Sequence, residues 1–289
     1  MISWLLTPLS YGFMQRGLLA AIMVGILCAI IGCYVVLRSM AFLGDALAHA
    51  ILPGIAVAYL LNGNLTVGAL VAAIAVAIGI GFFSRQGTIK EDTAIGILFT
   101  AALALGVALI SSIRTYAVDL SHILFGNLLG VGVTDLVLTG GLGLLVLLAV
   151  VLLYNQFLVI SFDPVLSATL RLPTELLRNL MLVLLAITIV ISLQTVGVGL
   201  VAAMLVTPAA TAYLLVRRLP AMMLLSAGIG AVSSIIGLYV SYYINIASGS
   251  AIVLTATLIF VVVYLFSPRR RSWRALFSRS KGPSSISHE

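Results

Sequence analysis

The stretch Arg38-Ser-Met-Ala-Phe-Leu-Gly-Asp-Ala-Leu-Ala-His-Ala-Ile-Leu-Pro-Gly54 places two ionisable residues, Asp45 and His49, inside an apolar segment long enough to cross a bilayer. Because the two are four residues apart, they project from one face of an α-helix, one turn apart. A carboxylate and an imidazole in this arrangement form half of a site for a divalent cation. Ionisable groups inside a membrane cost roughly 2.5–3.5 kcal/mol on insertion scales, which makes the pair a functional candidate.

Pro53 and Gly54 follow this pair within the same segment. Proline has no N–H, so Pro53 cannot donate a hydrogen bond to the carbonyl of His49, four residues earlier. We therefore expect the helix to kink at Pro53 and Gly54, beside the candidate site. In the alternative interpretation, Asp45 and His49 are hydrogen-bonded to each other and lock two helices together without binding a metal.

The composition of the whole chain excludes a soluble globular protein. Of its 289 residues, 62% are hydrophobic and 8% are charged. Apolar runs of about twenty residues, each sufficient to cross a hydrocarbon core, recur along the chain. They cover 17–37, 39–62, 65–84, 93–112, 134–154, 176–195, 197–216, 221–245 and 250–267. We predict an all-α, polytopic membrane protein with about eight or nine transmembrane helices, one permease-like domain over 1–267 and a basic, disordered tail over 268–289.

The ends of the predicted spans carry the basic residues in an asymmetric pattern. If the C-terminal tail is cytoplasmic, counting back through nine spans places most basic loop residues on the cytoplasmic side and leaves two outside. The inner set is Arg38, Arg85, Lys90, Arg171, Arg178, Arg217 and Arg218, and the outer pair is Arg16 and Arg114. This bias is typical of bacterial inner-membrane proteins. It accounts for the net charge of +7 without a nucleic-acid partner, and the tail is expected to be attracted to anionic membrane lipid. Residues 1–15 are expected to form a short helix at the membrane surface.

Two further segments carry candidate functional residues. Asp119 and His122 are three residues apart in a polar piece between spans, and they form a second candidate metal-capturing pair on the outer face, although surface Asp–His pairs are common. The long loop from Phe157 to Thr174 is predicted to contain a short amphipathic helix suited to docking into a groove on a partner. Its candidate contact residues are Asp163, Pro164, Leu166, Leu170 and Arg171. The alternative is a solvated connector.

Several sequence motifs are absent from the chain, and their absence limits the functions that the chain can have. The chain has no G-x-x-x-x-G-K-[ST], so it does not bind ATP through a P-loop, and it has neither H-E-x-x-H nor G-x-S-x-G. We therefore predict that the chain is not an enzyme. Cys28 and Cys33 are interpreted as small buried hydrophobes. Glycine clusters at 140–143, 197–199 and 228–230 predict close helix packing.

Three stretches together resemble the manganese/zinc/iron-chelate permease family of bacterial ABC importers. They are Arg38–Gly54, Ser161-Phe-Asp-Pro164 and Gly197-Val-Gly-Leu-Val-Ala-Ala-Met-Leu-Val-Thr-Pro-Ala-Ala-Thr-Ala212, and the resemblance covers about residues 12–267. It implies a type II ABC importer-like permease that forms a homodimer, pairs with separate ATPase subunits and receives metal from an extracytoplasmic metal-binding protein. It also implies that Asp45 and His49 contact the metal and that the loop after Asp163 couples the permease to the ATPase.

We therefore predict the permease subunit of an ATP-driven importer of divalent transition metal, with no permanently bound cofactor. A two-fold axis would bring two copies of Asp45 and His49 together, giving four ligands. Such a mixed set tolerates both manganese and zinc, with Fe²⁺ as a further candidate, and the absence of thiolate favours manganese. Because neutral imidazole binds metal, uptake should fall as His49 becomes protonated. The rival prediction is a proton-coupled secondary carrier without an ATPase, although the chain shows no convincing inverted repeat.

Overall fold

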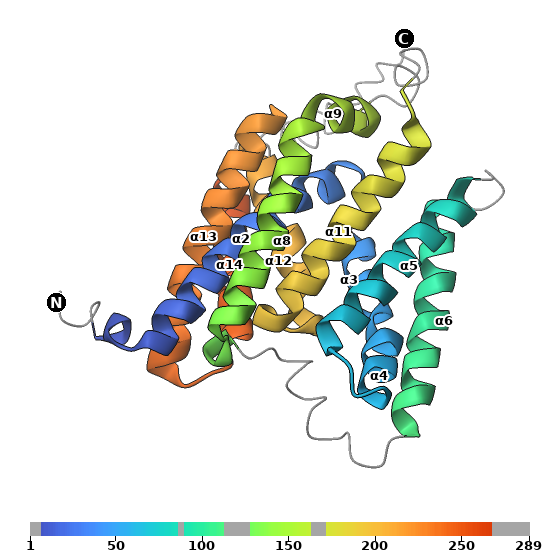
Figure 1. Cartoon of the computed structure of the whole chain (residues 1–289). Helices are drawn as coiled ribbons and strands as arrows, with labels where there is room; N and C mark the ends of the chain where they lie inside the picture. The colour runs from blue at the N-terminus through green and yellow to red at the C-terminus, as the bar shows by residue number, and fades with distance from the viewer. Residues whose placement is uncertain (1–6, 86–89, 113–127, 163–171, 268–289) are drawn as a thin grey trace, which may run out of the picture.

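The computed structural model describes residues 7–85, 90–112, 128–162 and 172–267, and within these ranges every regular element is helical. Figure 1 shows the helices packed side by side as a bundle, with α9 lying across one end. The elements are η1 (Pro8–Ser10), α2 (Gly12–Leu37), α3 (Ala41–Ala50), α4 (Leu52–Leu60), α5 (Leu65–Arg85), α6 (Glu91–Ser111), η2 (Leu128–Gly130), α8 (Val133–Leu152), α9 (Tyr154–Phe162), α11 (Thr174–Val196), α12 (Val198–Leu215), α13 (Leu219–Ile244) and α14 (Ser248–Phe266).

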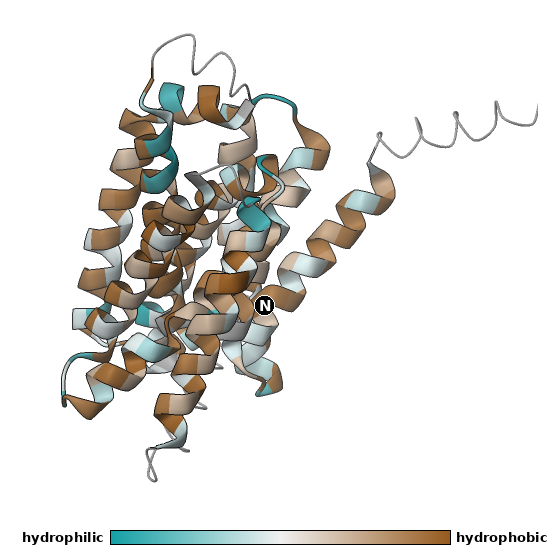
Figure 2. Cartoon of the chain, turned by 90° about the vertical axis from the view of Figure 1, so that its right-hand side faces the viewer, coloured by the Kyte–Doolittle hydropathy of each residue, from teal (hydrophilic) through white to brown (hydrophobic). Residues whose placement is uncertain are grey.

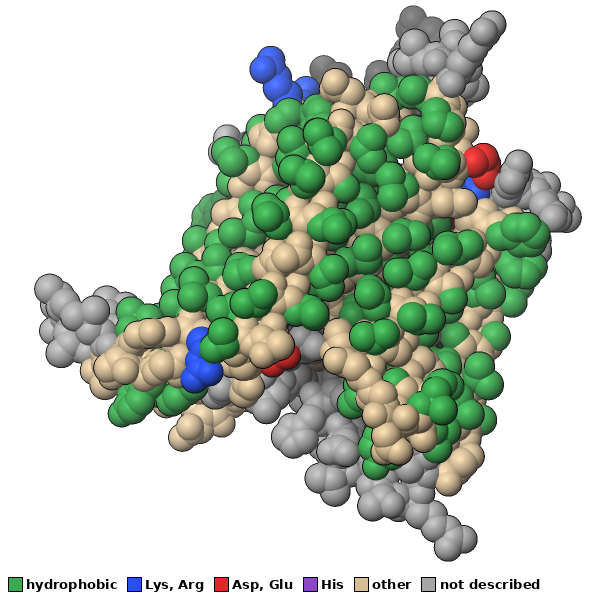
Figure 3. Space-filling view, viewed as in Figure 1, with side chains coloured by type: hydrophobic (Ala, Val, Ile, Leu, Met, Phe, Trp, Pro, Cys, Tyr) green, Lys and Arg blue, Asp and Glu red, His purple; other side chains and the backbone are tan. Residues whose placement is uncertain are grey.

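Within the described ranges, eight segments are long and apolar enough to cross a membrane, with α3 and α4 together counting as one of them. The apolar part of α12, Leu200–Leu215, is shorter. Hydrophobic residues run along the helices in Figure 2, and Figure 3 shows a surface of hydrophobic side chains with charged groups near its edges. The predicted all-α membrane protein with eight or nine spans is confirmed.

Helices α2 and α11 are the most buried of these spans and form the centre of the bundle. Cys28 and Cys33 lie in the buried part of α2 as free thiols. Glycines allow the close contacts around α2, because a Cβ atom on Gly25 would lie 2.9 Å from the carbonyl oxygen of Gly230 in α13. On Gly32 it would overlap the carbonyl oxygen of Leu205 in α12.

The predicted glycine clusters are confirmed in part as packing sites. Gly230 makes a close contact with α2, and a Cβ on Gly140 would lie 3.0 Å from Met23 Cε, also in α2. By contrast, a Cβ on Gly141 or Gly228 would have no atom within 4 Å outside its own helix backbone. A glycine matters only where two helices cross, and the crossing points depend on tertiary packing. Gly197 has a different role, because its φ of 87° at the junction of α11 and α12 is readily adopted only by glycine.

Ser39, the first residue of the second predicted span, lies in the turn between α2 and α3 and does not cap the following helix. Ser39 has a φ of 57°, and its N–H donates to the carbonyl oxygen of Val36 at 3.1 Å. The N–H of Met40 donates to the carbonyl oxygen of Val35 at 3.0 Å. These two bonds form a Schellman motif that ends α2. Met40, rather than Ser39, is therefore the N-cap residue of α3.

The second predicted span is divided into two helices. It breaks at Ile51, between α3 and α4, and Pro53 occupies the first turn of α4, where its missing N–H has no helical partner to lose. The end of α4 agrees with the predicted Asn62–Asn64 boundary, since Asn62 has a φ of 51°. Asn64 Oδ1 then accepts a hydrogen bond from the N–H of Thr66 at 2.9 Å and caps α5.

The predicted loop from Phe157 to Thr174 begins too early. Residues 154–162 form α9, and Phe157 is 1% exposed within it. At the N-terminus, the expected short helix is reduced to η1, because α2 begins at Gly12. Several candidate residues lie outside the described part of the chain, as does the tail 268–289. They are Asp119, His122, Asp163, Pro164, Leu166, Leu170 and Arg171.

Candidate metal site

Asp45 and His49 lie one turn apart on the same face of α3. His49 Nε2 is 3.6 Å from Asp45 Oδ1, and the two side chains are 27% and 40% exposed, respectively. This separation is too long for a hydrogen bond but within the range of an ion pair. One imidazole nitrogen and one carboxylate oxygen thus lie near each other, and both side chains are partly exposed. Together they offer the nitrogen and oxygen donors of a candidate cation site.

An aromatic side chain from a neighbouring helix lies against the pair. The ring of Phe99 in α6 is 6.1 Å from the His49 ring, centroid to centroid, and it meets Phe42 edge to face at 5.8 Å. Helix α6 therefore lies along the His49 face of α3 and restricts the space for its imidazole. Sequence analysis missed Phe99, because a single phenylalanine in an apolar span gives no signal that distinguishes this contact from ordinary packing.

Helix α12 holds α3 from another side. A Cβ atom on Gly44, the residue before Asp45, would lie 3.2 Å from Leu205 Cδ1 and 3.7 Å from Ala202 Cα. Two of the stretches singled out in the sequence, Arg38–Gly54 and Gly197–Ala212, therefore pack against each other in the structure.

The half of the span beyond the break shares α5 and α6 with α3 as neighbours but does not pack on α12. A Cβ on Gly54 would overlap the carbonyl oxygen of Gly68 in α5, and a Cβ on Gly106 in α6 would lie 2.7 Å from Leu52 Cβ and 3.1 Å from Pro53 Cδ. Helix α4 is thus enclosed by α5 and α6, whereas α3 also rests on α12. The break at Ile51 therefore separates α3, which carries Asp45 and His49, from α4, which packs against α5 and α6.

The pair does not make a complete metal site within one chain as far as the structure describes it. No group of three or more His, Cys, Asp or Glu side chains that could hold a metal ion occurs among the described residues. A transition metal such as zinc takes four ligands in most closed sites. Asp45 and His49 supply two, so further ligands must come from another copy of the chain, from undescribed residues or from water.

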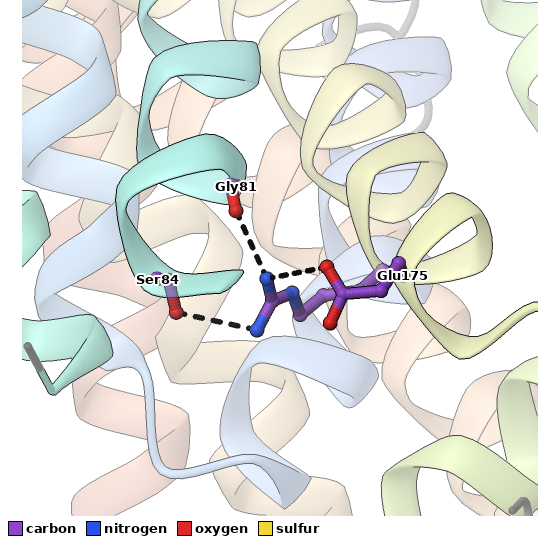
Figure 4. A network of polar contacts seen from close by, with 4 residues as sticks. Gly81, Ser84 and Glu175 are labelled. Carbon is purple, nitrogen blue, oxygen red and sulfur yellow. Dashed lines mark hydrogen bonds and ion pairs between the residues drawn. The ribbon is translucent and has the colours of Figure 1, made fainter. Parts of the chain in front are cut away.

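A second polar cluster lies at the end of the bundle where α2 ends and α6 and α11 begin, called here the Arg38 end. The guanidinium of Arg178 in α11 reaches across to the last turn of α5, and Figure 4 labels its three partners, Gly81, Ser84 and Glu175. Its Nη2 donates to the carbonyl oxygen of Gly81 at 3.0 Å and to Glu175 Oε2 at 3.3 Å, and its Nη1 donates to Ser84 Oγ at 3.2 Å. Arg178 therefore joins α11 to α5.

The charges at the Arg38 end match the helix dipoles. Arg38 follows the C-terminus of α2 and Arg178 lies at that of α5, while Glu91 and Glu175 lie in the first turns of α6 and α11. Cations at C-termini and anions at N-termini are stabilising. Burial lowers the pKa of the Arg38 guanidinium, the charge of Glu91 opposes this shift and that of Arg178 adds to it. Sequence analysis used Arg38 and Arg178 only as topology markers, although the three-residue spacing of Glu175 and Arg178 was a usable signal.

Comparison with known proteins was made at three levels. The ABC 3 transport family matches residues 10–267. The chain is 48% identical over 270 residues to the manganese transport system membrane protein MntC of Halalkalibacterium halodurans, covering 92% of each chain. It is 41% identical over 260 residues to the chelated iron transport system membrane protein YfeD of Yersinia pestis, covering 90% of this chain and 87% of the relative.

A solved structure shows the same fold. It is described as PsaBC from Streptococcus pneumoniae in complex with Fab, and it superposes on this chain with a TM-score of 0.84 at 40% sequence identity. The match covers 95% of this chain and 99% of the other.

Proposed function

We propose that this chain, which belongs to the ABC 3 transport family and is the membrane permease subunit of a metal importer, carries Mn²⁺ as its main cargo. It is a multi-pass membrane protein and a transport subunit rather than an enzyme. The observation that carries the proposal is the pair Asp45 and His49, which lie side by side on α3 without a hydrogen bond between them.

The choice of metal rests on donor chemistry and on relatives. Carboxylate and imidazole together accept Mn²⁺, Fe²⁺ and Zn²⁺, and the pair contains no thiolate to favour a softer ion. One relative is named for manganese transport and another for chelated iron. We therefore rank Mn²⁺ first and Fe²⁺ second, with Zn²⁺ as a competitor that the same ligands would hold.

The working unit in this proposal is a homodimer. Two copies related by a two-fold axis would place two Asp45 and two His49 side chains around one ion, and this would supply the ligands that the described residues of one chain lack. The metal ion is then a substrate that passes through, and no resident cofactor is needed.

The energy source in this proposal is a separate ATPase, because the sequence has no P-loop of its own. An extracytoplasmic metal-binding protein would deliver the ion. Asp163, Pro164, Leu166, Leu170 and Arg171, which lie outside the described residues, are proposed to contact the ATPase. The Arg38 end and the C-terminus would then face the cytoplasm, in keeping with the basic residues there, and Asp119 and His122 would capture metal on the opposite side.

Uptake of radiolabelled Mn²⁺ by cells tests the proposal. The chain is expressed with or without the ATPase encoded beside it, and unlabelled Zn²⁺ or Fe²⁺ is added as competitor. We expect uptake that requires the ATPase and that excess Zn²⁺ reduces. Uptake that ignores the ATPase and follows a proton gradient would instead identify a secondary carrier.

A further inference from the structure

Helix α9 packs against the last turn of α2 through two buried aromatic rings. Phe157 of α9 and Tyr34 of α2 are each 1% exposed, and their rings meet at 5.8 Å between centroids with an interplanar angle of 70°. This edge-to-face geometry is the favourable one for aromatic pairs. Helix α9 also contacts α8 and α11. It is therefore a packed helix, whereas the sequence analysis placed its residues from Phe157 onward in a loop.

The turn that begins at Tyr34 is followed directly in the chain by α3, which carries Asp45 and His49. The carbonyl oxygen of Tyr34 accepts a hydrogen bond from the N–H of Arg38 at 3.1 Å, and the N–H of Met40 donates to the carbonyl oxygen of Val35 at 3.0 Å. Helix α3 starts at Ala41. The backbone and its hydrogen bonds in this turn thus join the end of α2, where the Tyr34 ring lies, to the helix that carries Asp45 and His49.

The hydroxyl of Tyr34 does not hold the two helices together. Tyr34 Oη is buried and has no hydrogen-bond partner among the described residues, and the same holds for Ser161 Oγ. Ser161 lies four residues after Phe157, on the same face of α9. Since neither hydroxyl has a partner among the residues that the structure describes, the packing of the Tyr34 ring on Phe157 is the described contact that joins the two helices.

We propose that Tyr34 is a positioning residue for transport: its ring transmits movements of α9 to α3 and thereby sets the position of Asp45 and His49. This inference rests on the proposed importer function, in which the segment after α9 contacts the ATPase. Because packed side chains shift as units, a displacement of Phe157 must move the Tyr34 turn or break the ring contact. The hydrogen-bonded turn then carries the displacement into α3.

Two pairs of variants distinguish the effect of the ring contact from the effect of the Tyr34 and Ser161 hydroxyls. Tyr34→Leu and Phe157→Leu weaken the ring contact from either side, so that one remains informative if the other does not assemble. Tyr34→Phe keeps the ring, and Ser161→Ala removes an unbonded hydroxyl from the same face of α9. Both of these controls should behave like the wild type.

The experiment uses the permease–ATPase complex in lipid nanodiscs and measures hydrogen exchange of the α3 amides, together with Mn²⁺ transported per ATP hydrolysed. We expect each leucine variant to exchange at least about fivefold faster in α3, with α14 unchanged, and to transport at least about fivefold less Mn²⁺ per ATP. Unchanged α3 exchange in both leucine variants would overturn the inference, whatever the cargo. If the leucine variants exchange faster in α3 but the wild-type complex transports no Mn²⁺, the link between α9 and α3 stands and the proposed function is refuted.

Discussion

Gly54 of α4 and Gly68 of α5 approach so closely that a Cβ atom on either residue would overlap the carbonyl oxygen of the other. The contact lies directly after Pro53 and fixes the second half of the broken span to α5. The first half is held by α12 at Gly44 and carries the metal pair. The pair therefore belongs to a half-helix whose neighbours differ from those of the segment that follows it.

This crossing predicts that alanine is not tolerated at either glycine. Gly54→Ala or Gly68→Ala should destabilise the protein by about 1–3 kcal/mol, because the added methyl group meets backbone that cannot move aside. Thermal unfolding in detergent measures the effect. Gly96→Ala in α6 is the matched control, since a Cβ there has no atom within 4 Å outside its own helix backbone. Equal unfolding temperatures for all three variants would contradict the crossing.

The turn at Ser39 predicts opposite effects of two substitutions. A non-glycine residue in the left-handed region carries a strain of roughly 1–2 kcal/mol, so Ser39→Gly should stabilise the native turn or leave it unchanged. Ser39→Val should destabilise it, because a β-branched residue is disfavoured at this φ. The comparison is made by thermal unfolding of the two variants side by side. A valine variant as stable as the glycine variant would exclude the Schellman turn.

The contacts of Arg178 predict a graded loss of stability, smaller in Arg178→Lys than in Arg178→Ala. The guanidinium serves Gly81, Ser84 and Glu175 at once and its side chain is 16% exposed, so Arg178→Ala should cost about 1.5–3 kcal/mol of stability. Arg178→Lys should fall in between, since an ammonium group keeps the charge without the fork of donors. Denaturation of the purified permease measures this order. Arg217→Ala, at an exposed arginine, should have little effect, and a loss as large as that of Arg178→Ala would refute the assignment.

The parts of the site that could be predicted from the sequence follow local rules. The four-residue spacing of Asp45 and His49 fixes a shared helix face in any α-helix. The missing N–H of Pro53 favours an interrupted or kinked helix nearby, and Asn62-Gly63-Asn64 supplies the residues that helix ends favour. Each of these inferences needs only a few neighbouring residues.

The parts that sequence analysis missed depend on distant contacts. Serine suits both a helix N-cap and, less often, a left-handed turn, and the role of Ser39 is decided by α2 continuing through Leu37. The helical state of Phe157 depends on a buried place beside Tyr34, which is more than a hundred residues away in the sequence. Phe99 contacts His49 only because α6 packs along α3. No local pattern contains these crossings.

The central claim is that Asp45 and His49 bind the transported ion. The direct test is ATP-dependent uptake of radiolabelled Mn²⁺ by vesicles that contain the permease and its ATPase, with Asp45→Ala, His49→Ala and, as a control outside the site, His288→Ala. We predict that both site variants lose uptake and still assemble with the ATPase, whereas His288→Ala transports like the wild type. Wild-type uptake in both assembled site variants would contradict the account.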